Sequence, residues 1–65
     1  MATLARTVKR ARQARGLTQT QLAQTAQVSQ AFISQLEAGE IGVLTLPTAL
    51  RLAKVLKIDV AKLAE

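Results

Sequence analysis

Apolar residues recur along the chain at the spacing of α-helices rather than of strands. A first helix is predicted over residues 3–15, with Thr3 as its N-cap, because apolar residues share one of its faces. These residues are Leu4, Val8 and Ala11. Nowhere in the 65 residues do apolar and polar positions alternate as they do in a half-buried strand, so the chain is expected to be all-α.

Two shorter helices are predicted in the middle of the chain, on either side of a tight turn at residues 27–28. Residues 18–21 read Thr-Gln-Thr-Gln, a capping-box pattern that begins the first of these helices, which is expected to end near Ala26. Ser29 is expected to cap the second, which runs to Ala38. Two short helices joined by so short a turn are typical of a helix-turn-helix motif.

The helix predicted up to Ala38 has two unlike faces. Ile33 and Leu36 lie on the face that is expected to point into the core. The residues on the opposite face are Gln30, Ala31, Ser34 and Gln35. In helix-turn-helix proteins that bind DNA the second helix enters the major groove, so these residues are candidates for reading bases. The alternative is an ordinary solvated polar face.

A loop at residues 39–45 precedes two further predicted helices. Thr45 is expected to cap the first of them, with Pro47 in its first turn, where a missing N–H costs nothing. Its predicted apolar stripe consists of Leu46, Ala49, Leu50, Ala53 and Leu56. Asp59 is expected to cap a last short helix. The expected architecture is therefore five short helices around one core, in a single domain that spans residues 1–65.

Composition narrows the range of functions. The chain has 9 Lys and Arg against 4 Asp and Glu, a net charge of +5, which favours a polyanionic partner, nucleic acid before membrane. It contains no Cys and no His, which removes thiolate and imidazole as nucleophile, general base or metal ligand. We therefore expect no enzyme activity, no metal, no cofactor and no small-molecule substrate. Because Phe32 is the only aromatic residue, no platform for stacking bases is expected.

The N-terminal segment does not resemble a secretory signal, because Arg6 stands where such a signal would be apolar. No run in the sequence approaches the roughly 18 apolar residues that a membrane-spanning helix needs. A cytoplasmic protein without membrane contact is therefore expected.

Three segments, in this order and spacing, resemble the Cro/CI type of helix-turn-helix, which is also called the lambda-repressor-like or xenobiotic-response-element family. They are Gln19-x-x-Leu22-Ala23, then Val28-Ser29-Gln30-x-x-Ile33-Ser34-Gln35-Leu36-Glu37-x-Gly39, then Leu50-x-Leu52-Ala53-Lys54-x-Leu56. The resemblance extends from Leu4 to Leu63. It implies a sequence-specific DNA-binding regulator from a bacterium or phage, most often a repressor, which binds a palindromic operator as a homodimer with its third helix in the major groove.

The resemblance also implies roles for single residues. It assigns base reading to the outward residues of the third helix, where a Gln amide matches adenine and an Ala methyl matches thymine. Gln19 corresponds to a phosphate-clamping position. Because residues 16–50 contain no Lys or Arg, further backbone contacts are expected from helix N-termini, which points to Thr18 and Ser29. Arg10 on the first helix is expected to add another.

Arg12 and Glu37 correspond to a partly buried ion pair of the family, which would tie the first helix to the third. The alternative is two independent surface charges. Family members usually pair near the loop and helix that follow, and surplus apolar residues there predict a homodimer interface. These residues are Ile41, Val43, Leu44 and Val55. The alternative is that the loop residues simply cover the core.

Two residues depart from the family pattern at positions where many members have glycine. Gln27 stands in the turn of the motif and Lys57 stands at the end of the fourth helix. A positive φ at either position would strain an L-residue. The lack of Lys and Arg in residues 16–50 also keeps a second function open, a protein-interaction module of the same fold, such as an antitoxin, with weak or no DNA binding.

Overall fold

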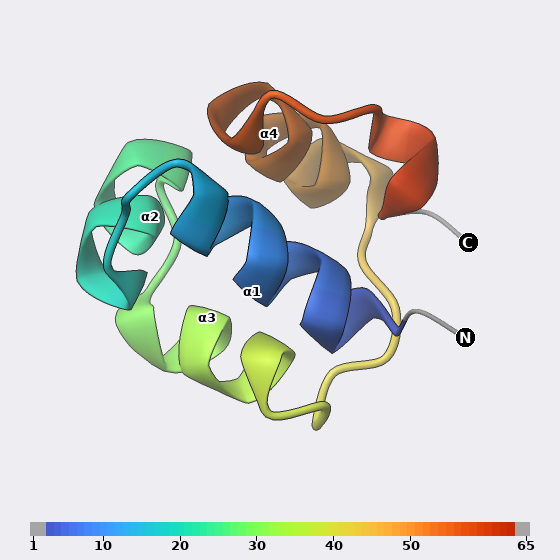
Figure 1. The fold of residues 1–65 in the computed structure, drawn as a ribbon. Coiled ribbons are helices and arrows are strands. Elements are labelled where there is room, and N and C mark those ends of the chain that lie inside the picture. The colour runs from blue at the N-terminus through green and yellow to red at the C-terminus, as the bar shows by residue number, and fades with distance from the viewer. Residues whose placement is uncertain (1–2, 64–65) are drawn as a thin grey trace.

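The computed structural model describes residues 3–63, and the end residues of the predicted domain, 1–2 and 64–65, lie outside that description. Residues 3–63 form four α-helices and one short 3₁₀ turn (Figure 1). They are α1 (Leu4–Ala14), α2 (Gln19–Ala26), α3 (Gln30–Glu37), α4 (Leu46–Leu56) and the 3₁₀ turn η1 (Val60–Lys62). The all-α class is confirmed, since residues 3–63 contain no strand.

The expectation of five helices is wrong, because the last predicted helix is a single 3₁₀ turn. Asp59 caps it as expected, and its carboxylate accepts a hydrogen bond from the Ala61 N–H at 3.0 Å. The backbone bonds that follow join residues three apart, from Lys62 to Asp59 and from Leu63 to Val60. Too few residues separate the cap from the buried Leu63 to close α-helical turns, whose nucleation is costly.

Three of the four caps expected for the α-helices are present. The hydroxyls of Thr3, Thr18 and Ser29 accept hydrogen bonds from backbone N–H groups three residues later, at 3.2, 3.0 and 3.0 Å. At α2 the capping box is complete, because the Gln21 side chain accepts a hydrogen bond from the Thr18 N–H at 2.9 Å. These caps explain why the helices begin where the sequence predicts.

The fourth expected cap differs in its bonding. Thr45 occupies the N-cap position of α4, but its side chain caps no backbone N–H and its hydroxyl bonds to the Thr48 hydroxyl at 3.1 Å. Pro47 in the first turn has no N–H to donate, which leaves the Thr48 N–H as the remaining cap donor, and the Thr45 hydroxyl donates to the Thr48 hydroxyl instead of accepting from that N–H. The helix still begins here, because the fixed φ of proline suits a first turn.

Every α-helix contributes fully buried apolar residues to one core. They are Val8, Leu22, Ala23, Ala26, Ile33, Leu36, Ala49, Leu52, Ala53 and Leu56, and Leu63 closes the core after η1. Burying each of the larger side chains contributes about 1.5–3 kcal/mol, which makes this core the main source of stability in so short a chain. The two residues expected to point inward from α3 are among those buried.

The apolar stripe predicted for α4 is partly wrong. Leu46 and Leu50 are 61% and 50% exposed, whereas Leu52, which the predicted stripe leaves out, is fully buried. Helical spacing permits both sets, because residues 46 and 50 lie on a face beside that of the buried residues. α4 packs against α1, α2 and η1 on one side only, so it buries the narrower set and leaves the two leucines on the surface.

α1 crosses the molecule between α3 and α4 and packs against both (Figure 1). α2 also packs against α3 and α4, and η1 packs against α4. This arrangement covers the inner side of α3 and leaves its outer side free. Within residues 3–63 no helix is long and apolar enough to cross a membrane.

Gln27 and Lys57, which stand where the family often has glycine, both adopt a positive φ. The φ angle is 61° at Gln27, which ends α2, and 57° at Lys57, which ends α4. The next residues use this conformation to close the helices, with Val28 and Ile58 donating to carbonyls five residues back. Each L-residue held in this conformation carries a strain of about 1 kcal/mol.

Lys57→Gly is expected to raise the free energy of unfolding by up to about 1 kcal/mol, because glycine adopts this φ without a Cβ clash. Chemical denaturation of the two proteins measures the difference. Lys57→Ala is the matched control, since it removes the same charge but keeps the Cβ, and it should not stabilise the domain. A lower denaturation midpoint for Lys57→Gly than for the parent would contradict this account of the strain.

Candidate nucleic-acid interface

α2 and α3 are joined by a turn of residues 27–29 and packed together through their inner faces. The Val28 N–H donates to the Ala23 carbonyl at 2.9 Å and closes the turn. Leu22 of α2 and Ile33 of α3 are both fully buried in the shared core. Because the inner face is fixed by this packing, the outer face of α3 is held in a defined orientation toward solvent.

The structure brings the predicted base-reading residues together on the exposed side of α3. Gln30, Ala31, Ser34 and Gln35 are all exposed. Their spacing of one and four residues places them on a single helix face. That face carries two amides, one hydroxyl and one methyl group and no charge, so it can both donate hydrogen bonds and accept them. Phe32 lies beside it but is half-buried and packs against the core.

Thr18 and Ser29 stand at the N-termini of α2 and α3, and both are exposed. Each hydroxyl accepts the capping hydrogen bond and keeps its own proton for donation to another group. The first N–H groups of an α-helix have no partner within the helix, and its dipole favours an anion at this end. These two residues are therefore suited to contact phosphate in the absence of Lys or Arg.

Arg12 and Glu37 form the expected ion pair between α1 and α3. Arg12 donates through Nε to Glu37 Oε2 at 2.7 Å and through Nη2 to Glu37 Oε1 at 3.0 Å. Their side chains are only 13% and 4% exposed, and the bidentate geometry makes this a strong pair. Hydrogen bonding to Glu37 raises the pKa of Arg12 above its ordinary value. Arg12 also donates through Nη1 to the Leu17 carbonyl at 2.7 Å, which ties in the segment before α2.

Gln19 makes a contact that the sequence does not predict. Its Nε2 donates to Glu37 Oε1 at 3.2 Å, so Glu37 joins α1, the first residue of α2 and the end of α3. The two residues are 18 positions apart, and no spacing rule links them. The sequence indicates only that Glu37, an acidic residue on the helix expected to read DNA, needs hydrogen-bond donors. Arg12 alone already provides them. Gln19 is thereby held at the N-terminus of α2.

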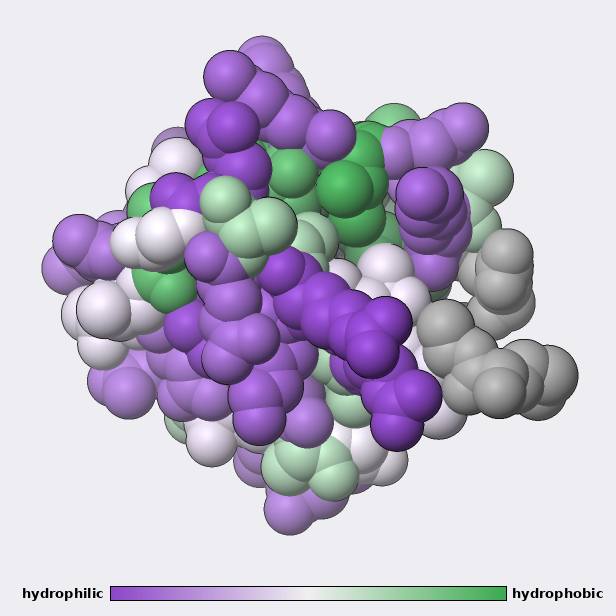
Figure 2. All heavy atoms as spheres, viewed as in Figure 1, coloured by the Kyte–Doolittle hydropathy of each residue, from purple (hydrophilic) through white to green (hydrophobic). Residues whose placement is uncertain are grey.

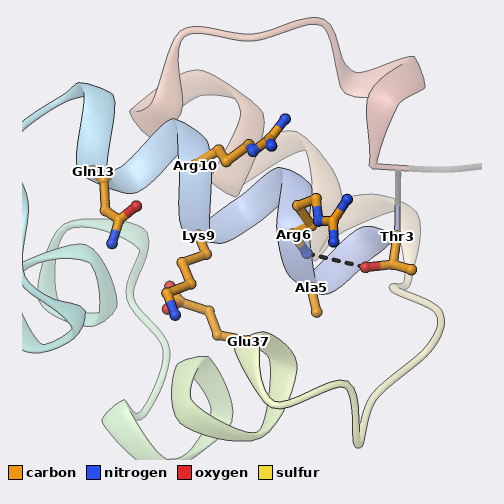
Figure 3. Close-up of a pocket in the computed structure, with 7 residues that line it drawn as sticks. All are labelled: Thr3, Ala5, Arg6, Lys9, Arg10, Gln13 and Glu37. Carbon is orange, nitrogen blue, oxygen red and sulfur yellow. Dashed lines mark hydrogen bonds between the residues drawn. The ribbon is translucent and has the colours of Figure 1, made fainter. Parts of the chain in front are cut away.

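The cations of α1 point in different directions. A shallow depression of about 400 Å³ lies beside Glu37, and its lining includes Arg6, Lys9, Arg10 and Gln13 (Figure 3). In that view Lys9 points toward Glu37, whereas Arg10 points away from it, toward the C-terminal segment. The structure does not bring Arg10 together with the residues at the N-termini of α2 and α3, and its contact with the DNA backbone stays a prediction.

The residues predicted for a homodimer interface fall into two groups. The first group is partly buried, packs against the core and consists of Ile41, Leu44 and Val55. These residues therefore cover the core, which is the alternative to an interface role. Val43 is 76% exposed. The other large apolar residues that are exposed within residues 3–63 are Leu46 and Leu50, on the first turns of α4. The large apolar residues exposed on this part of the chain are therefore Val43, which was predicted, and Leu46 and Leu50, which were not.

An all-helical domain with a tight turn between α2 and α3, a packed inner face and a free polar outer face is a helix-turn-helix domain. The chain belongs to the helix-turn-helix domain family, whose model matches residues 3–65. A search of curated protein sequences found no match to the chain.

Solved structures of the protein SinR share the fold. A crystal structure of SinR, the master regulator for biofilm formation, in complex with DNA superposes with a TM-score of 0.88 at 21% identity, over 94% of this chain and 97% of that one. The SinR–SinI protein complex gives a TM-score of 0.86 at 21% identity, over 94% of this chain and 59% of that one. The N-terminal DNA-binding domain of SinR from Bacillus subtilis gives 0.86 at 22% identity, over 92% and 87%.

Proposed function

We propose that this chain binds double-stranded DNA and reads its sequence with α3 in the major groove. The observation that carries the proposal is the exposed, uncharged polar face of α3, held in place by a helix-turn-helix core. A B-DNA major groove admits an α-helix, and a helix-turn-helix presents its second helix to that groove. The fold also supports the proposal, because a domain of the same fold, SinR, has been solved in complex with DNA.

The side chains of α3 suit particular bases. Gln30 and Gln35 each carry a donor and an acceptor that match the major-groove edge of adenine. The Ala31 methyl can pack against a thymine methyl, and the Ser34 hydroxyl can donate or accept. Thr18 and Ser29 would hold phosphates at two helix N-termini, and these neutral donors release fewer counterions than Lys or Arg would. The salt dependence of binding is therefore expected to be shallow.

Glu37 supports this interface in spite of its charge. Its carboxylate is neutralised by Arg12, so it does not repel a phosphate as a free acid would. It also accepts one N–H of the Gln19 amide and leaves the second N–H of that amide to donate to a phosphate. We therefore assign Gln19 to the DNA backbone and Arg12 and Glu37 to positioning it.

We propose further that the domain is a transcriptional repressor that occupies a palindromic operator as a homodimer. The support for a dimer is the apolar surface formed by Val43, Leu46 and Leu50, which the core leaves exposed. In a dimer with a two-fold axis through this surface, the same residues of the two copies would cover one another. Half-sites about one helical turn apart are then expected.

The double substitution Val43→Lys, Leu50→Lys is expected to weaken self-association and the affinity for a two-half-site duplex together, because it places like charges across the axis. Sedimentation equilibrium measures the association and circular dichroism checks the helical content. Ala14→Lys, Ala61→Lys is the matched control, since it adds the same charge at exposed positions elsewhere. If the first variant associates as the parent does, the surface is not the interface.

The function itself is tested by selecting bound duplexes from a random DNA pool and titrating the enriched sequence against a scrambled one. We expect the enriched duplex to bind about 10³-fold more tightly or better, as specific complexes do. The competing function is a protein-interaction module of the same fold, which the lack of Lys and Arg in α2 and α3 favours. Absence of enrichment, with equal weak binding to both duplexes, would contradict DNA reading and support that second function.

A further inference from the structure

The basic residues are unevenly distributed over the domain. α2 and α3 carry none, and the cations lie on or directly after α1 and α4 and in η1. Arg12 among them is neutralised by Glu37. Most of the positive charge therefore lies on elements other than the motif that we propose to read DNA.

A groove with a basic rim lies between α1 and residues 58–62, with a volume of about 480 Å³. Its floor is mainly apolar and consists of Thr7, Ala11, Ala14 and Ile58. Its rim consists of Arg6, Arg10 and Lys62. No carboxylate from the part of the chain that the structure describes lines it. The space-filling view shows apolar surface framed by hydrophilic side chains on the side of the molecule where α1, α4 and the C-terminal segment meet (Figure 2).

We propose that this groove docks an acidic segment of a partner protein, with an apolar side chain on the floor and carboxylates against the rim cations. Two kinds of complementarity coincide there. Guanidinium groups bind carboxylates in a bidentate fashion, which gives both strength and orientation. Covering Ile58 and Ala11, which are only half-buried, removes apolar surface from water. An amphipathic acidic segment supplies both groups at once.

A nucleic-acid backbone fits this groove less well. Phosphates would satisfy the cations, but a sugar-phosphate backbone offers no apolar side chain to cover the floor. Phosphate sites also commonly use backbone N–H groups at a helix N-terminus. The groove instead runs along α1 from Arg6 to Ala14, and the N–H of Arg6, in the first turn, already donates to the Thr3 hydroxyl. We therefore assign the groove to an acidic protein segment rather than to DNA.

The groove and α3 lie on different sides of α1. Arg12 of α1 donates to Glu37 of α3. Ala11 and Ala14 of α1 instead line the groove together with Ile58. A docked segment would therefore leave the exposed face of α3 free. The proposal does not depend on DNA binding, and it is tested without DNA.

The probe is a short synthetic peptide in which leucines at helical spacing are flanked by glutamates, titrated into the ¹⁵N-labelled domain. We expect amide shifts at Ala11, Ala14 and Ile58 and none on α3.

The charge-reversal variant Arg6→Glu, Lys62→Glu should weaken binding of the peptide about tenfold or more, since two attractive contacts become repulsive. Arg10 is left unchanged in both charge-reversal variants. The matched control is the double variant Arg51→Glu, Lys54→Glu, which has the same net charge as the first variant. It should bind the peptide as the parent does, apart from the loss of general electrostatic attraction to the glutamates.

Equal weakening by the two charge-reversal variants, or shifts scattered over the surface, would overturn the proposal, because general charge attraction would then explain the binding. A peptide with glutamines in place of glutamates should bind at least tenfold more weakly. A random-sequence duplex that shifts the groove amides more than the peptide does would assign the groove to nucleic acid instead. Ala14→Glu provides a second variant at an exposed position, and it should block the peptide while helical content is retained.

Discussion

Arg12→Met is expected to lower the free energy of unfolding by about 2–4 kcal/mol, because it removes the partner of a charge that is nearly fully buried. Glu37 is 4% exposed and would keep only the Gln19 amide as a donor. The Leu17 carbonyl would also lose the guanidinium that it accepts from. Chemical denaturation monitored by circular dichroism measures the loss. Arg15→Met is the matched control, since it removes an exposed arginine at the end of α1 and should cost less than about 1 kcal/mol.

The double substitution Arg12→Met, Glu37→Leu should recover part of the loss, because an apolar pair of similar size needs no charge compensation. The coupling between the two sites is then read from the double-mutant cycle. If the two single effects add without coupling, the residues do not act as a pair in solution. The pair would then contribute neither to stability nor to the position of Gln19.

The same pair determines how the domain responds to alkaline pH. The pKa of Arg12 is raised by its hydrogen bond to Glu37, so the folded state binds this proton more tightly than the unfolded state does. The contribution of Arg12 is therefore fully present below its unfolded-state pKa and is lost only as the pH rises through the higher folded-state value. Moderately alkaline pH should leave the pair intact.

The parts of the fold that depend on neighbours in the sequence were predictable. Capping hydroxyls act on N–H groups three residues away, so Thr3, Thr18 and Ser29 could be assigned from local spacing alone. The inward residues of α3 follow equally from helical periodicity. The resemblance placed Gln27 and Lys57 where many members have glycine and left their φ open, and the structure shows it to be positive at both.

The parts that depend on contacts between distant segments were not predictable in the same way. The periodicity of α4 cannot distinguish a wide apolar stripe from a narrow one, and only the packing of other helices leaves Leu46 and Leu50 exposed. The contact of Gln19 with Glu37 joins two helices through side chains. The groove beside α1 exists because the turn after α4 returns Ile58 and Lys62 to the first helix. None of these contacts leaves a periodic signal in the sequence.

Gln30→Ala is expected to cost about 1–3 kcal/mol on the best duplex and to relax the preference at one base position per half-site. Gln30 is the first residue of α3 and is exposed on the face that we propose to read bases. The N-terminal residues of a recognition helix contact base edges in motifs of this kind. Its amide offers one donor group and one acceptor to a single base, which matches adenine better than any other base.

Binding-site selections with the parent and with each variant measure this change in preference. Gln24→Ala is the matched control, because it removes the same amide from an exposed position on α2. It should leave the preference unchanged at every position. A loss of affinity shared equally by all sequences would instead place Gln30 at the DNA backbone, where contacts carry no sequence information. If Gln30→Ala returns the preference and affinity of the parent, the residue is only solvated, and the assignment of the reading face to the exposed side of α3 fails with it.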